Sequence, residues 1–119
     1  MNMITKHFMS YRYAMRGVWL AMRYEPNMLF HLAGGLAVVI LNFLLDVSRQ
    51  DWLITLVLVA LTWSAEVFNT SIEKLADRVT REQDPIIGQV KDLAAGAVLI
   101  IAFFAVVCAA IIYVPYWWG

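Results

Sequence analysis

The chain contains 119 residues, of which 62% are hydrophobic and 15% charged, and its nine basic and nine acidic residues leave no net charge. Soluble domains are about half apolar with about a quarter of their residues charged. The composition therefore indicates a protein of the lipid bilayer and excludes a disordered chain, a coiled coil or a large soluble enzyme. Zero net charge gives no case for nucleic-acid binding, and the single cysteine, Cys108, excludes a disulfide framework or a cysteine metal cluster.

The first segment, residues 4–24, is predicted to be an amphipathic helix lying in the membrane interface. On a helical wheel its apolar side chains share one face, comprising Ile4, Phe8, Tyr11, Met15, Val18, Trp19 and Met22, and one flank carries Arg12, Arg16 and Arg23. The alternative, a solvated linker with chance periodicity, is weaker because the pattern continues over about five turns. Basic residues interrupt any short apolar run, so the segment is not a signal peptide.

Three later segments, residues 28–47, 52–72 and 90–116, are apolar enough to span a bilayer about 30 Å thick, which needs about 20 helical residues. The second keeps a helical composition until Pro85, so we expect it to leave the membrane as one continuous helix. Asp84 and Pro85, an N-cap acceptor followed by proline, predict the start of the third helix. The predicted fold class is therefore all-α integral membrane: a single domain, residues 1–119, with three transmembrane helices and a surface helix.

The basic residues predict the orientation of the chain. They gather before the first span and after the second, whereas the loop between the first two spans carries only Arg49 and the C-terminal tail carries none. The positive-inside rule therefore places the N-terminus and the second loop in the cytoplasm. The basic residues of that loop are Lys74, Arg78, Arg81 and Lys91.

Polar side chains on the second span form a ridge on one face of the helix. Glu66, Asn69, Glu73 and Asp77 recur at i, i+3, i+7 and i+11, within an arc of about 80°. Glu66 lies about 22 Å along a helix that starts near the outer surface, inside the hydrocarbon, and Glu73 lies about 10 Å further, near the cytoplasmic boundary. A specific role is the default for an ionisable residue at that depth. The alternative is a packing seam, but a seam has no need for three carboxylates.

Carboxylates at this boundary suit divalent metal and phosphate chemistry. Mg²⁺ prefers oxygen ligands, so one or two carboxylates and nucleotide phosphates complete its shell. Lys91 either neutralises a transferring phosphoryl group or is a snorkelling anchor paired with Asp92 or Glu73. Glu25 either joins the metal or favours the N-terminus of the first span. His31 is interpreted as an interhelical hydrogen-bonding residue. The sequence has no phosphate loop or kinase catalytic loop, so any nucleotide site is of another type.

Three blocks of the sequence resemble the prokaryotic diacylglycerol kinase family. Residues 66–77, EVFNTSIEKLAD, resemble its signature of a glutamate, then Asn-Ser/Thr, a second glutamate and an aspartate. Residues 91–99, KDLAAGAVL, look like its second block, and residues 13–17, YAMRG, look like its N-terminal helix block. Residues 25–31, EPNMLFH, are similar to the branch that includes the undecaprenol kinases, with Leu29 where an arginine is common there. Asp84 lies where the family often has histidine.

The resemblance implies a homotrimer of three-span protomers in the bacterial inner membrane, with active sites built between neighbouring subunits. It also implies ATP as co-substrate and Mg²⁺ as the metal. Carried over by position, Glu66 would be the general base for the lipid hydroxyl, and Glu25 and Glu73 would be the metal carboxylates. The residues that would bind the nucleotide are Lys6, Tyr13, Asn69, Lys91 and Asp92.

The leading hypothesis is therefore a membrane lipid kinase that transfers the γ-phosphoryl group of MgATP to a lipid alcohol. The alcohol is either diacylglycerol, giving phosphatidic acid, or undecaprenol, giving undecaprenyl phosphate. The rival hypothesis is a small proton-coupled transporter that uses Glu66, but such proteins usually have four spans and no cytoplasmic carboxylate cluster. A third hypothesis, a catalytically inactive assembly subunit, is disfavoured because every expected site residue is present.

Overall fold

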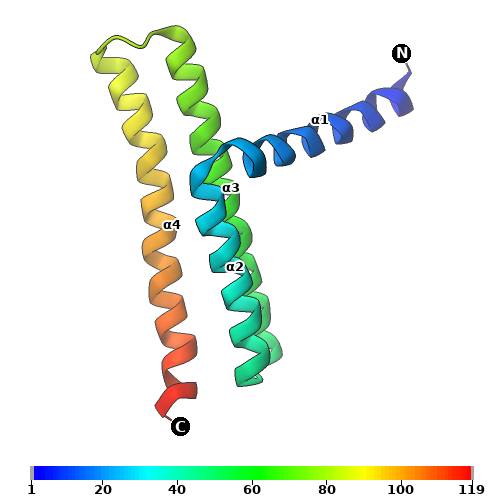
Figure 1. Ribbon diagram of the computed structural model, residues 1–119, viewed down its shortest axis with the longest axis vertical. Coiled ribbons are helices and arrows are strands. Elements are labelled where there is room, and N and C mark those ends of the chain that lie inside the picture. Colours follow the sequence, from blue (N-terminus) through cyan, green and yellow to red (C-terminus); the bar gives the residue numbers. More distant parts are fainter. Residues whose placement is uncertain (1, 119) are drawn as a thin grey trace.

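The computed structural model describes residues 2–118 and arranges them in four helices (Figure 1). The helices are α1 (Met3–Tyr24), α2 (Pro26–Leu45), α3 (Arg49–Val79) and α4 (Pro85–Trp118). Helices α2, α3 and α4 are long and apolar enough to cross a membrane. The all-helical class and the three candidate spans predicted from the sequence are confirmed. The segment predicted to lie in the membrane interface is a helix, and its place in the interface stays a prediction.

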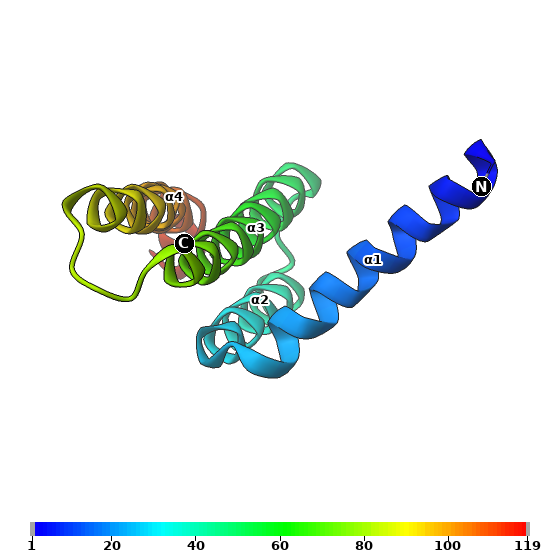
Figure 2. The ribbon, with the colours of Figure 1, turned by 90° about the horizontal axis from the view of Figure 1, so that it is seen from above.

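Helix α1 projects sideways from the other three helices (Figures 1 and 2). Its first turn is capped by Asn2, whose Oδ1 accepts a hydrogen bond from the backbone N–H of Thr5 at 2.8 Å. The helix ends at Glu25, whose backbone is extended (φ −98°, ψ 114°). Pro26 disfavours a helical conformation at the residue before it and is itself well suited to open a helix. The Glu25–Pro26 pair therefore forms the corner between α1 and α2.

A short turn joins α2 to α3. Asp46 adopts the left-handed conformation (φ 51°), which ends α2 two residues before the predicted limit of the span at 47. Ser48 Oγ then accepts a hydrogen bond from the Asp51 backbone N–H at 3.1 Å and starts α3. The two helices approach closely at Gly35, where an added Cβ would lie 2.7 Å from Cζ2 of Trp63. A small residue at this position allows the close helix contact.

Helix α3 is continuous over 31 residues, about 46 Å at 1.5 Å per residue, which is longer than the hydrocarbon core is thick. The continuous helix predicted beyond the bilayer is thus confirmed as far as Val79. Helix α4 begins at Pro85, where Asp84 Oδ1 accepts from the backbone N–H groups of Ile86 and Ile87 at 2.9 and 3.0 Å. This confirms the predicted N-cap, and the spans predicted at 52–72 and 90–116 lie inside longer helices.

The two ends of the helix bundle differ. The α1–α2 corner lies toward the same end as the α3–α4 connection, and α3 and α4 continue past the level at which α1 leaves (Figure 1). The α2–α3 turn and the end of α4 lie at the opposite end (Figure 1). The arrangement is compatible with the predicted orientation, in which the N-terminal segment and the second loop share one side of the membrane.

A polar cluster ties the three candidate spans together near the α2–α3 turn. Asn42 on α2 is fully buried and donates from Nδ2 to Thr55 Oγ1 on α3 at 2.9 Å. Its Oδ1 accepts from the Tyr113 hydroxyl on α4 at 2.6 Å. Water does not compete for these bonds in lipid, so they favour one register of the three helices. We call Asn42, Thr55 and Tyr113 the Asn42 cluster.

Candidate active site

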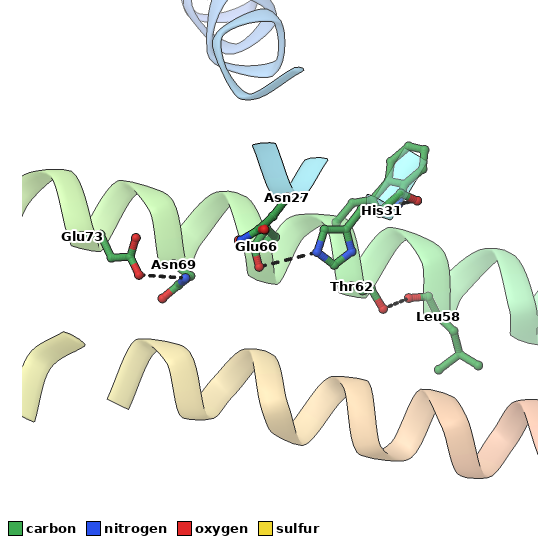
Figure 3. A network of polar contacts seen from close by, with 8 residues as sticks. Asn27, His31, Leu58, Thr62, Glu66, Asn69 and Glu73 are labelled. Carbon is green, nitrogen blue, oxygen red and sulfur yellow. Dashed lines mark hydrogen bonds and ion pairs between the residues drawn. The ribbon is translucent and has the colours of Figure 1, made fainter. Parts of the chain in front are cut away.

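Glu66 is a buried carboxylate on α3, with an exposed fraction of 5%. Asn27 Nδ2 donates to Glu66 Oε1 at 3.4 Å, and His31 Nε2 lies 3.6 Å from Glu66 Oε2 (Figure 3). Both partners come from the first turns of α2, directly after the corner. Each oxygen of the carboxylate therefore has a polar neighbour from α2, as expected for an ionisable group kept among apolar helices.

Asn69 and Glu73 continue the polar ridge along α3, away from the Asn42 cluster. Asn69 Nδ2 donates to Glu73 Oε1 at 3.3 Å. The Asn69 Oδ1 atom is buried and has no hydrogen-bond partner among the described residues. A buried acceptor without a partner costs about 1–3 kcal/mol of folding free energy, so a hydrogen-bond donor or a cation beside this oxygen would be stabilising. Figure 3 shows both side chains on the side of α3 that faces α4.

Lys91 on α4 pairs with Asp77 on α3 through Nζ and Oδ1. The lysine therefore contacts Asp77, which is neither of the two partners expected for a snorkelling anchor. Asp77 lies about 42 Å along α3 from its first residue, beyond a hydrocarbon core about 30 Å thick. The hydrogen bond from Lys91 lowers the pKa of Asp77 from its ordinary value of 3.8. Both side chains are about 40% exposed, so solvent screens the pair and its effect on stability is small.

The other predicted site residues lie outside this ridge. Glu25 stands at the α1–α2 corner, where its side chain makes no capping hydrogen bond, and Asp92 is exposed on α4. Lys6 and Tyr13 are exposed on α1, and Lys6 lies about 28 Å along that helix from the corner, at 1.5 Å per residue. Among residues 2–118, no three His, Cys, Asp or Glu side chains converge into a group that could hold a metal ion.

Sequence reasoning missed Asn27 and gave His31 no partner. The available signal was their spacing of four residues, which places two polar side chains on one face of an otherwise apolar helix. That spacing does not say which neighbouring helix the face meets. In the structure the face meets α3 at Glu66, where the close contact between Gly35 and Trp63 brings the two helices together.

An apolar groove of about 270 Å³ begins at His31 and Trp63 and continues between α2, α3 and α4 toward the Asn42 cluster. Its wall on α3 extends from Trp63 to Thr55, which is about 12 Å of helix. Small side chains help to form the other walls, including Gly34, Gly35, Ala105 and Ala109. Glu66 does not line the groove itself, but its neighbour His31 does, so the groove begins beside the Glu66 end of the polar ridge.

Comparisons with known proteins agree with the three sequence blocks. The family model for prokaryotic diacylglycerol kinase matches residues 12–113. An undecaprenol kinase of Bacillus subtilis is 36% identical over 114 residues, which cover 96% of this chain and 93% of that protein. A diacylglycerol kinase of Synechocystis is 30% identical over 107 residues, which cover 89% of this chain and 61% of that protein. The matches give the transporter hypothesis no support. This chain belongs to the prokaryotic diacylglycerol kinase family and is a lipid kinase.

Proposed function

We propose that this lipid kinase transfers the γ-phosphoryl group of ATP to the hydroxyl group of undecaprenol, with Glu66 as the general base. The observation that carries the proposal is the position of Glu66, a buried carboxylate of the polar ridge whose neighbour His31 lines the apolar groove. The groove suits a hydrocarbon chain and the ridge suits phosphates, so a lipid hydroxyl and a nucleotide would meet at this carboxylate. The hydroxyl proton passes to Glu66, the hydroxyl oxygen bonds to the γ-phosphorus, and ADP leaves.

The choice of undecaprenol over diacylglycerol rests on the two relatives. The relative named undecaprenol kinase is 36% identical and aligns with this chain over 93% of its own length. The relative named diacylglycerol kinase aligns over 61% of its length.

The ridge is where the nucleotide and its metal would bind. Mg²⁺ would be held by Glu73 and Glu25, because the Glu25 carboxylate makes no capping bond and the unpartnered Asn69 Oδ1 lies beside Glu73. When bound, the ion supplies positive charge that neutralises the phosphates. Lys91 and Asp92 would contact the nucleotide, with the Asp77 contact holding the Lys91 ammonium at the ridge.

The complete site would form between subunits of a homotrimer in the bacterial inner membrane, with the α3–α4 connection in the cytoplasm. Lys6 and Tyr13 would bind nucleotide, yet α1 extends away from its own bundle (Figure 2). A cyclic trimer would supply the missing contact, because each subunit would offer its α1 to a neighbour.

The test is a phosphorylation assay in mixed micelles with ATP and Mg²⁺, in which undecaprenol and diacylglycerol compete. We expect phosphate on undecaprenol, and Glu66→Gln should lower the rate by about 10²–10⁴-fold, the usual contribution of a general base. Glu82→Gln, at an exposed carboxylate on the α3–α4 connection, is the matched control and should leave the rate unchanged. Preference for diacylglycerol would overturn the choice of lipid, and substantial activity of Glu66→Gln would remove Glu66 as the base.

A further inference from the structure

Glu66 is approached from α2 at both of its carboxylate oxygens. Asn27 Nδ2 lies 3.4 Å from Oε1 and His31 Nε2 lies 3.6 Å from Oε2 (Figure 3). A carboxylate offers about four acceptor positions, so two neighbours leave positions free for a substrate hydroxyl. The terminal torsion of a glutamate side chain is otherwise broad, and partners on separate oxygens would restrict the plane of the carboxylate.

His31 is itself held by α3. The indole Nε1 of Trp63 donates to the backbone carbonyl of His31 at 2.8 Å. The indole ring occupies the space over Gly35, where a Cβ would lie 2.7 Å from Cζ2. Trp63 precedes Glu66 by three residues, so one turn of α3 carries both the carboxylate and the side chain that positions the facing histidine.

We propose that His31 and Asn27 are positioning residues for the general base, an inference that rests on the proposed role of Glu66. A base works only when its lone pair is aimed at the proton, and a misplacement of about 1 Å costs about 100-fold in rate. The two contacts are slightly longer than hydrogen bonds of about 2.7–3.2 Å. Catalytic contacts are often long before substrate binds and shorten in the substrate complex. Once shortened, the His31 contact would become a hydrogen bond to Oε2 in the tautomer that carries the proton on Nε2.

A competing role for His31 is that of a groove wall, because its ring also lines the apolar groove. Two substitutions separate the roles. His31→Gln retains an N–H donor near the position of Nε2, whereas His31→Leu retains bulk without a donor. Asn27 does not line the groove, so Asn27→Leu removes only the donor to Oε1. Val38→Ala enlarges the groove at a position away from Glu66. It is the control that changes lipid binding without removing a donor to the carboxylate.

The experiment measures kcat and the KM for undecaprenol with the full-length protein in mixed micelles, and circular dichroism verifies helix content. His31→Leu and Asn27→Leu should lower kcat by about 10–100-fold with little change in KM. His31→Gln should recover most of the kcat that His31→Leu loses. Val38→Ala should change KM alone.

Several outcomes would overturn the proposal. A rise in KM without a fall in kcat for His31→Leu would make His31 a groove wall, and equal losses for leucine and glutamine would show that its donor is not the operative group. An unchanged kcat for Asn27→Leu would show that Asn27 is not a positioning residue. If His31→Leu does not fold, Asn27→Leu and His31→Gln still carry the test. Failure of the proposed function looks different, because wild-type protein would then phosphorylate no lipid or Glu66→Gln would remain active.

Discussion

Replacing Asn42 by leucine should destabilise the protein by about 1–3 kcal/mol. The substitution removes two hydrogen bonds between helices, from Asn42 Nδ2 to Thr55 and from the Tyr113 hydroxyl to Asn42 Oδ1. Such bonds average about 0.6 kcal/mol each in membrane proteins and reach about 1.7 kcal/mol. Leucine has the same number of side-chain heavy atoms as asparagine, with the same branching, so no cavity is left, although its methyl groups take up more room than the amide. Thr55 keeps backbone acceptors at Asp51 and Trp52, whereas the Tyr113 hydroxyl loses its acceptor in an apolar setting.

The measurement is unfolding by a denaturing detergent in mixed micelles, followed by circular dichroism. Tyr113→Phe and the double variant with Asn42→Leu complete a double-mutant cycle, which isolates the coupling between the two side chains. We expect a coupling of about 0.5–1.7 kcal/mol. Tyr116→Phe is the control and should cost less, because the hydrogen bonds that it removes, to Asp51 and from the Ser48 backbone N–H, lie at the exposed end. Additive effects of the two buried substitutions, or no loss of stability in Asn42→Leu, would refute the reasoning.

Three further predictions use the same unfolding measurement. Gly35→Ala should lower the free energy of unfolding by about 1–3 kcal/mol, because the added methyl group overpacks the contact with α3. Gly34→Ala is the control and should cost nothing, because its added methyl group meets nothing within 4 Å. Equal effects of the two substitutions would contradict the close contact at Gly35. Asp84→Ala should lower the free energy of unfolding by about 0.5–2 kcal/mol, because two backbone N–H groups lose their capping acceptor. An unchanged midpoint of unfolding would show that the cap does not stabilise the protein. Lys91 lowers the pKa of Asp77 in the folded state, so the pair stabilises the folded protein fully at pH values above the ordinary pKa of 3.8. This stabilisation is lost as the pH falls from 3.8 through the lowered pKa of Asp77. Asp77→Asn should remove this loss of stability at acid pH. Identical pH profiles of stability for the wild type and the variant would show that Asp77 is not the group responsible.

Much of the fold follows from local sequence patterns. The three spans are predicted by apolar length, and the start of α4 by Asp84 and Pro85. The ridge of Glu66, Asn69 and Glu73 is also a local pattern, because helical periodicity alone places those residues on one face. The lipid kinase activity follows from the same blocks, since the spacing of their residues is specific enough to indicate the family. These features need only the geometry of a single helix or the order of residues along the chain.

The contacts between helices could not be predicted in the same way. Periodicity assigns Asn27 and His31 to one face of α2, but only the tertiary structure turns that face toward Glu66. It likewise decides that Lys91 meets Asp77. Such contacts depend on the rotation and register of one helix against another, which side-chain packing and interhelical hydrogen bonds settle. The sequence by itself therefore determined the helices, the spans and the polar ridge, whereas the tertiary structure decided which residues surround the base, because no local pattern encodes how two helices are turned toward each other.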